Sequence, residues 1–297
     1  MKKQPAIEIK QLHKSYGNVK ALRGVDLTIE PGEIFGFLGP NGAGKTTTVR
    51  CMLDQIRPDS GSISIFGLNP QKQPVAVKQK CSYLPGELNL ESGLKVRDQL
   101  KYFVELRGKH VDWKHVEALA ERFELNLDLK IKNLSKGNKQ KVGVVQALMH
   151  KSELLILDEP TSGLDPLMQQ EVLNALKEAK QVGATVFFSS HIISEVEAIA
   201  ERVAIIRKGV IAEIVSPEQL SAMQIRRVRV VFAEATPASA FDGLEDVIIL
   251  PQEQDHILRF EVHGNIDAVI KAIAAHTVVD LTMERPTLEE AFLAYYQ

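Results

Sequence analysis

Cysteine is scarce in this sequence, which holds only Cys51 and Cys81 among 297 residues. The two have neither CxxC spacing nor a neighbouring histidine cluster, so the pattern argues against a disulfide framework and against a zinc site. Two isolated cysteines are typical of a protein in a reducing cytosol, although counting alone leaves one internal bridge open.

Long apolar runs are missing as well. No stretch approaches the roughly eighteen apolar residues that span a bilayer, and residues 1–16 contain no hydrophobic signal region. We therefore expect a chain that is neither exported nor membrane-spanning by itself.

The sequence also lacks an excess of one charge, because 36 basic residues stand against 38 acidic ones. Without a global field we expect no nucleic acid partner and no anionic membrane surface as the main partner, while local patches stay open. A hydrophobic fraction of 44% is ordinary for a globular protein. The length suits one large domain followed by a small one.

One glycine-rich stretch carries a specific pattern. Residues 39–47 match the phosphate-loop pattern GxxxxGK[ST], after a strand-like run at 33–38 and before a helix-like run at 45–55. Glycines let backbone N–H groups turn inward around a phosphate, and the N-terminus of the following helix attracts the same anion. We expect Lys45 to bind the β and γ phosphates and Thr46 to bind Mg²⁺. The residues expected to contact the nucleotide are Gly39, Asn41, Gly42, Ala43, Gly44, Lys45, Thr46 and Thr47.

A pair of acids follows a second apolar run. Residues 153–157 form a continuous apolar stretch that ends in Asp158 and Glu159, as expected for a buried parallel strand whose end lies at the ligand-binding edge of a sheet. Asp158 is a candidate Mg²⁺ ligand, and Glu159 is a candidate general base.

The alternation of periodicities indicates a doubly wound α/β core with an antiparallel β portion at its start. Helical spacing dominates residues 96–125, and Ser135 is a natural N-cap for a helix over 136–150. We expect one domain over residues 1–218, with a helical subdomain at about 88–150. Residues 219–297 are expected to form a small α+β domain that ends in a helix over 287–296.

Six segments in this order resemble the ATP-binding subunit of an ABC transporter. They are the phosphate loop (Walker A), LLILDE at 154–159 (Walker B), LSKGN at 134–138 (the signature), SGLD at 162–165 (the D-loop), His191 (the switch histidine) and Tyr16 (the A-loop aromatic). The resemblance covers roughly residues 5–220, and the final MERPTLEEAFLAYY resembles the C-terminal extension of drug, antibiotic and polysaccharide exporters.

The resemblance implies a P-loop ATPase core that hydrolyses ATP with Mg²⁺. It implies that Tyr16 stacks on adenine, that Lys45, Glu159 and His191 are catalytic, and that two copies face head to tail. Ser135 and the Gly137 amide would then complete the γ-phosphate site of the second copy. The resemblance further implies separate polytopic membrane subunits, a cytoplasmic position on the inner face of the cell membrane, and export.

Two departures from the family pattern stand out. Gly86 occupies the Q-loop position where the family usually has a glutamine, with Glu87 next to it. In the signature, Lys136 replaces a glycine and Asn138 a glutamine, and Lys136 can either approach the partner's γ-phosphate or face solvent. Two other functions remain as alternatives: a soluble ABC ATPase acting on ribosomes or DNA, and a nucleotide-binding regulatory module with little turnover.

Overall fold

The computed structural model describes residues 4–108, 111–222, 225–252, 254–263 and 266–284. The contacts divide the chain into two compact units, Met1–Pro217 and Glu218–Gln297.

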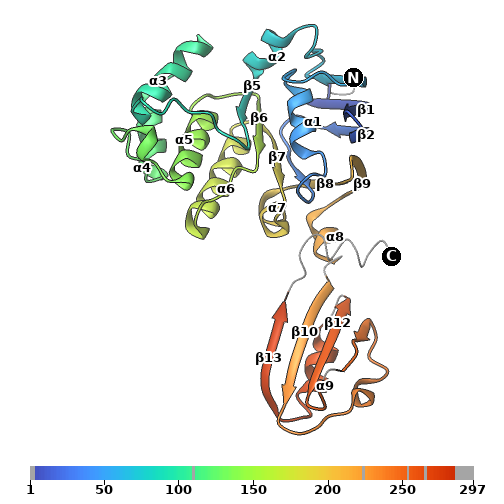
Figure 1. Cartoon of the computed structure of the whole chain (residues 1–297). Coiled ribbons are helices and arrows are strands. Elements are labelled where there is room, and N and C mark those ends of the chain that lie inside the picture. Colours follow the sequence, from blue (N-terminus) through green and yellow to red (C-terminus); the bar gives the residue numbers. More distant parts are fainter. Residues whose placement is uncertain (1–3, 109–110, 223–224, 253, 264–265, 285–297) are drawn as a thin grey trace. The chain divides into compact units, whose positions relative to one another are not determined.

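The first unit is built on a six-stranded sheet (Figure 1). Its strands, in spatial order, are β5 (Cys81–Leu84), β6 (Leu154–Asp158), β7 (Thr185–Ser190), β3 (Ile34–Leu38), β8 (Arg202–Arg207) and β9 (Val210–Val215). The first five run parallel, and β9 pairs antiparallel with β8. Strands β3, β6 and β7 are buried along their whole length, which explains their continuous apolar sequences.

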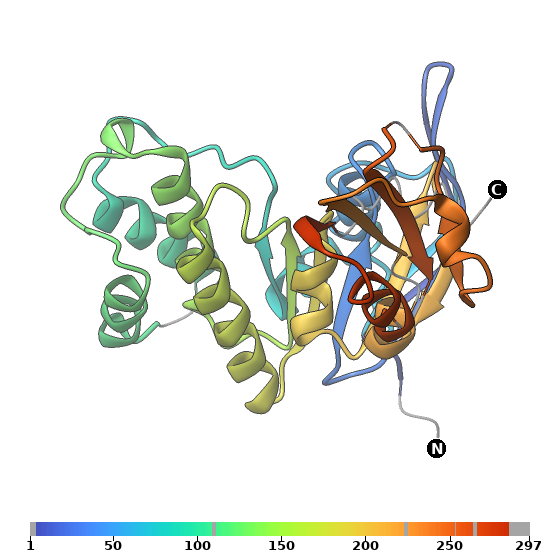
Figure 2. The same ribbon diagram turned by 90° about the horizontal axis from the view of Figure 1, so that it is seen from below.

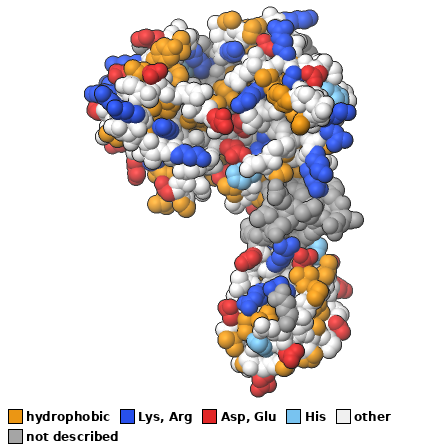
Figure 3. Space-filling model, viewed as in Figure 1, with side chains coloured by type: hydrophobic (Ala, Val, Ile, Leu, Met, Phe, Trp, Pro, Cys, Tyr) orange, Lys and Arg blue, Asp and Glu red, His pale blue; other side chains and the backbone are white. Residues whose placement is uncertain are grey.

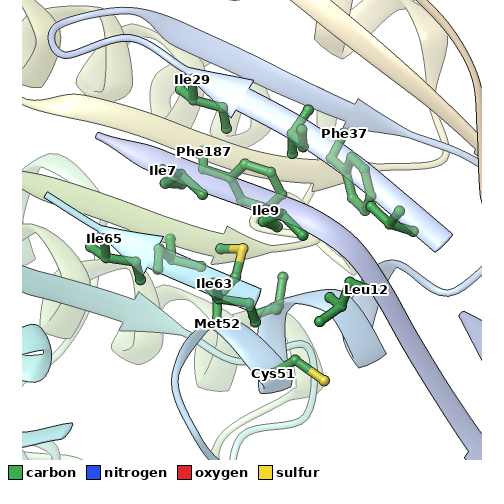
Figure 4. Close-up of a cluster of buried hydrophobic side chains, with 14 of the residues drawn as sticks. Ile7, Ile9, Leu12, Ile29, Phe37, Cys51, Met52, Ile63, Ile65 and Phe187 are labelled. Atoms are coloured by element: carbon green, nitrogen blue, oxygen red, sulfur yellow. The ribbon is translucent and has the colours of Figure 1, made fainter. Parts of the chain in front are cut away.

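A smaller antiparallel sheet has the order β2 (Val19–Ile29), β1 (Ile7–Tyr16) and β4 (Ser60–Ile65). This sheet is the antiparallel portion that the sequence predicts. Buried side chains from both sheets and from α1 form one core (Figure 4). The labelled members are Ile7, Ile9, Leu12, Ile29, Phe37, Cys51, Met52, Ile63, Ile65 and Phe187. Ala43, in the loop that follows β3, is a member of this core.

The helices of the first unit are α1 (Lys45–Met52), α2 (Pro74–Lys80), α3 (Val96–Arg107), α4 (Trp113–Arg122), α5 (Lys136–Leu148), α6 (Pro166–Gln181) and α7 (Ile193–Ile199), with a 3₁₀ turn η1 at Ile131–Asn133. Figures 1 and 2 show α3, α4 and α5 gathered at one end of this unit, with β1 and β2 at the other. Among the described residues, no helix is both long enough and apolar enough to cross a membrane.

One helix prediction needs correction, and one helix was not predicted. The helix after the phosphate loop ends at Met52 and not at residue 55, because Asp54 takes a left-handed backbone with φ 52°. Helix α2 went unrecognised in the sequence, although Pro74 at its first turn is a common helix-start signal.

Helix α8 (Pro217–Ala222) begins at the last residue of the first unit. The second unit then contains β10 (Ile225–Phe232), η2 (Ala238–Phe241), β11 (Val247–Ile249), β12 (Ile257–His263), α9 (Asp267–Ile273) and β13 (Val278–Glu284). Its antiparallel sheet has the order β11-β12-β10-β13, and it forms its own apolar core with α9. This is the α+β arrangement that the sequence predicts. The helix predicted over residues 287–296 lies outside the described residues.

Charged side chains of both signs are interspersed on the face of the molecule in Figure 3.

Candidate functional site

The sheet order brings three chemically important strand ends together. Strand β7 lies between β6 and β3, with Asp158 opposite Ser189 and Leu38 opposite Ser190. Because these strands are parallel, the segments that leave their carboxyl ends share one edge of the sheet. The phosphate loop, the acid pair and His191 therefore emerge next to one another.

A cavity of about 140 Å³ lies at this edge. It is lined by Ala21, Pro40, Asn41, Gly42, Gly44, Lys45, Thr46, Thr47 and Glu159. Most of the predicted phosphate-contacting residues thus surround one space, together with the acid predicted to be the base.

Glycine is required at two points of this loop. A Cβ on Gly39 would lie 2.4 Å from the carbonyl oxygen of Ile206, so only glycine permits this close approach. Gly44 has φ 113° and precedes the first turn of α1. These positions let the loop fold back so that the N–H groups at the start of α1 border the cavity, which is an arrangement that binds anions.

Lys45 is 5% exposed and surrounded by oxygen atoms. Its Nζ donates to the carbonyl oxygens of Gly39 at 2.6 Å and Pro40 at 3.2 Å, and it lies 3.3 Å from Oε1 of Glu159. The ammonium group is therefore held at the cavity wall, where it can exchange these oxygens for those of a phosphate.

Glu159 has an unusual backbone conformation, with φ 51° in the left-handed region. Its N–H donates to the carbonyl oxygen and to Oγ of Ser189, at 3.2 and 3.1 Å. Its Oε2 lies 3.2 Å from Nδ1 of His191, whose side chain is 43% exposed. One carboxylate thus touches both other predicted catalytic side chains, Lys45 and His191.

Asp158 is fully buried, and its two oxygens have different surroundings. Oδ1 accepts a hydrogen bond from Ser189, while Oδ2 has no hydrogen-bond partner among the described residues. A Cβ on Gly86 would lie 3.2 Å from this Oδ2. Burial raises the pKa of nearby Tyr83 to about 12, and the negative charge of Asp158 adds to the shift.

These surroundings fit Mg²⁺, whose ligands are oxygens and which is usually held by one or two carboxylates, substrate phosphates and water. Asp158 has a buried oxygen without a partner, and Thr46 contributes a hydroxyl at the cavity wall. The described residues contain no group of three or more His, Cys, Asp or Glu side chains able to hold a metal by themselves. Substrate oxygens would have to complete such a site.

Other predicted residues lie outside this cavity. Ser135 caps α5 by accepting from the N–H of Asn138 at 3.2 Å, as the sequence predicts, and it is exposed. Lys136 is exposed, and a Cβ on Gly137 would lie 2.7 Å from the carbonyl oxygen of Gly163. Tyr16 is 47% exposed at the end of β1, with Lys14 Nζ 5.7 Å from its ring centroid.

The structure also shows supporting contacts that the sequence does not reveal. Nε2 of Gln140, on α5, donates to the carbonyl oxygens of Glu159 and Pro160, both at 3.0 Å. Glu195 is buried and accepts from the hydroxyls of Thr161 and Ser190, at 2.5 and 2.6 Å. Gln140 and Glu159 are 19 positions apart in the sequence, and Thr161 and Glu195 are 34 positions apart. No local pattern therefore predicts these two contacts.

Comparison with known proteins gives a consistent result. The ABC transporter family profile matches residues 22–162. The chain is 42% identical to the ABC transporter ATP-binding protein YhaQ of Bacillus subtilis, over 68% of each chain. It is 31% identical to the bacitracin transport ATP-binding protein BcrA of Bacillus licheniformis, over 97% of this chain and 96% of that protein. It is also 32% identical to the daunorubicin resistance ATP-binding protein DrrA3 of Streptomyces coeruleorubidus, over 97% and 95%.

Solved structures agree on the fold. An ATP-binding subunit of an ABC transporter superposes with a TM-score of 0.66 at 29% identity, over 72% of this chain and 91% of that one. A dimeric ATP-binding cassette bound to ADP and Pi has a TM-score of 0.65 at 22% identity, over 71% and 98%.

Proposed function

This chain belongs to the ABC transporter family as an ATP-binding and ATP-hydrolysing subunit, and we propose that its residues divide the catalytic work as follows. The observation that carries the proposal is the position of Glu159, whose two carboxylate oxygens lie 3.3 Å from Lys45 and 3.2 Å from His191 beside the phosphate loop.

The nucleotide binds along the phosphate loop. Backbone N–H groups of residues 39–47, including Asn41, Ala43 and Thr47, surround the phosphates. The ammonium group of Lys45 exchanges its hydrogen bonds to the carbonyl oxygens of Gly39 and Pro40 for hydrogen bonds to phosphate oxygens. The exposed ring of Tyr16 is available to stack on adenine.

Thr46 and Asp158 are the residues that would hold Mg²⁺ together with the phosphates. The ion would supply positive charge against the charge that develops on the transferred phosphoryl group. The partnerless Oδ2 of Asp158 supports this assignment, because a buried carboxylate oxygen without a donor is costly unless a cation or its bound water satisfies it.

Glu159 acts as the general base. Once Lys45 has turned to the phosphates, Glu159 accepts a proton from the attacking water, and His191 holds the γ-phosphate side of the site. Ser189 fixes the backbone of Glu159 and the carboxylate of Asp158 at the same time.

A second copy of the chain completes the site. Ser135 is exposed, Gly137 is half-buried, and neither lines the phosphate-loop cavity of its own chain, so the start of α5 is available for the partner's γ-phosphate. ATP then stabilises the closed dimer because it contacts both copies only there, and hydrolysis lets the dimer reopen.

The dimer works at the inner face of the membrane, bound to separate polytopic membrane subunits that carry the exported compound. The names of relatives refer to bacitracin, daunorubicin and linearmycin, which supports export of an antibiotic or drug-like compound.

Two measurements test this function. In the full chain, Glu159→Gln should lower steady ATP turnover by roughly 10²- to 10⁴-fold, which is the usual contribution of a general base. Glu153→Gln is the control, because Glu153 is an exposed acid paired with Lys80, and it should leave turnover unchanged. Purification in detergent should yield a complex with a polytopic membrane protein.

The alternatives have distinct outcomes in the same experiments. Copurification with ribosomes or DNA in place of a membrane protein would favour the soluble ATPase. Turnover that is negligible in the wild type and unchanged by Glu159→Gln would favour the regulatory module, for which Gly86 in the Q-loop is the best support.

A further inference from the structure

Gln140 is a buried polar side chain whose amide group bonds to the backbone of the turn at Glu159 and Pro160. It lies on the second turn of α5 and is 6% exposed. Its Nε2 donates to two consecutive carbonyl oxygens, those of Glu159 and Pro160, at 3.0 Å each. An amide nitrogen has two protons, so this pair of bonds satisfies it completely.

These bonds act on the part of the backbone that sets the direction of the catalytic carboxylate. Glu159 occupies the left-handed region, φ 51°, which a non-glycine residue keeps only when its surroundings hold it there. Ser189 on β7 holds the N–H of Glu159, and Gln140 on α5 holds its carbonyl oxygen. The residue is therefore fixed from two different elements.

Helix α5, which carries Gln140, begins at the signature residues 135–138. Ser135 caps α5, and at a rise of about 1.5 Å per residue Gln140 lies roughly 7.5 Å further along the axis. The start of α5 also packs tightly on the turn after Glu159, since a Cβ on Gly137 would lie 2.7 Å from the Gly163 carbonyl oxygen. A ligand that fixes the start of α5 thus acts on a helix already bonded to the Glu159 backbone.

We propose that Gln140 is a positioning residue that couples the two nucleotide sites of the dimer through α5. This inference rests on the proposed function, in which the start of α5 binds ATP in the partner's site while Glu159 acts in its own. ATP held by one signature would then favour the productive orientation of Glu159 in the other site.

The test compares the full wild-type chain with Gln140→Met, which keeps the length of the side chain and removes both donors. We expect kcat to fall by roughly 10- to 100-fold, as small misplacements of a catalytic group do, with the Kd for ATP changed less than about twofold. The dependence of rate on ATP concentration should lose its cooperativity, with the Hill coefficient falling towards one.

Gln169→Met is the matched control. Gln169 on α6 also donates to a backbone carbonyl of this turn, that of Leu164 at 3.1 Å, but it does not touch Glu159 or Pro160. Its loss should leave both kcat and the Hill coefficient close to wild type. Equal effects of the two variants would overturn the assignment to Gln140.

The outcomes also separate this inference from the proposed function. If Glu159→Gln abolishes turnover while Gln140→Met leaves kcat and the Hill coefficient unchanged, the coupling role is wrong and the proposed function stands. If Gln140→Met lowers kcat and ATP affinity together and leaves the Hill coefficient unchanged, Gln140 is merely structural and the coupling is again wrong. If Glu159→Gln has no effect on turnover, the proposed function itself fails.

Discussion

The phosphate-loop wall, which we define as residues 39–47 with Asp158, Glu159 and His191, keeps its polar groups in contact with one another within a single chain. Lys45 and Asp158 are buried, and Glu159 joins Lys45 to His191. The signature wall, residues 135–138, instead presents an exposed helix start whose serine is used for its own cap. The first wall is preformed by internal contacts, whereas the second, in the function proposed above, binds nucleotide only when it faces another copy.

This contrast follows from how each wall is supported. The first lies at the carboxyl ends of three buried parallel strands, and Ala43 of its loop belongs to the core formed by both sheets and α1. The second is the start of one helix, where Gly137 packs closely on the turn at Gly163.

Among the variants considered in this section, Lys45→Ala should weaken ATP binding the most. Removing a charged donor to phosphate costs about 1.5–3 kcal/mol, so Kd should rise roughly 10- to 150-fold. Equilibrium binding of a fluorescent ATP analogue measures this, with the exposed Lys72→Ala as control. Unchanged affinity in Lys45→Ala would contradict the preformed first wall.

Ser135→Arg should impair the second wall, at the signature, without impairing ATP binding at the first wall. The added bulk and charge at the start of α5 should lower turnover by at least about tenfold, because two copies no longer close, while the single chain binds ATP as before. Ser135→Ala is the matched control, since it loses the same cap, worth about 1 kcal/mol, without the bulk. Equal turnover of the two variants would attribute the loss to the missing serine hydroxyl, in its cap or its phosphate contact, and not to a steric block of closure.

Gly86→Ala should have a modest effect on the metal side of the first wall. The new Cβ would lie 3.2 Å from Oδ2 of Asp158, and a displacement of a few tenths of an ångström costs about 0.5–1 kcal/mol. The Mg²⁺ concentration for half-maximal turnover should therefore rise roughly two- to fivefold. Gly93→Ala, with its nearest neighbour 4.0 Å away, should not change it.

The two cysteines should show the smallest effect, namely almost no reaction in the native chain. Burial raises the pKa of Cys51 to about 11 and that of Cys81 to about 12, so at pH 8 both thiols stay protonated. A thiol count should give none in buffer and two in denaturant, with or without ATP. Rapid native labelling would show that the core behind the first wall opens.

The main features of the site could be predicted from the sequence because each is local. The phosphate loop has a fixed spacing of Gly39, Gly44, Lys45 and Thr46, and the buried strand before Asp158 is a continuous apolar run. Parallel strands then bring their carboxyl ends together by topology alone. The fold class and the family were predicted correctly for the same reason.

The supporting contacts could not be predicted, because they depend on side chains that meet only after folding. Nothing near Gln140 in the sequence indicates that its amide binds the Glu159 carbonyl, and nothing near Glu195 indicates Thr161. The early end of α1 is a local feature instead, since Asp54 takes a left-handed backbone and the N–H of Gln55 donates to the carbonyl oxygen of Arg50. The apolar periodicity of the sequence does not reveal this turn.

The left-handed backbone of Glu159 also has a thermodynamic consequence. This conformation destabilises an L-residue by about 1–2 kcal/mol, whereas glycine, which has no Cβ, adopts it freely. A chain with glycine at this position would relieve the strain and lose its carboxylate. The site thus gives up some folding stability to aim one acid, and a search for stabilising substitutions would select against activity at this position.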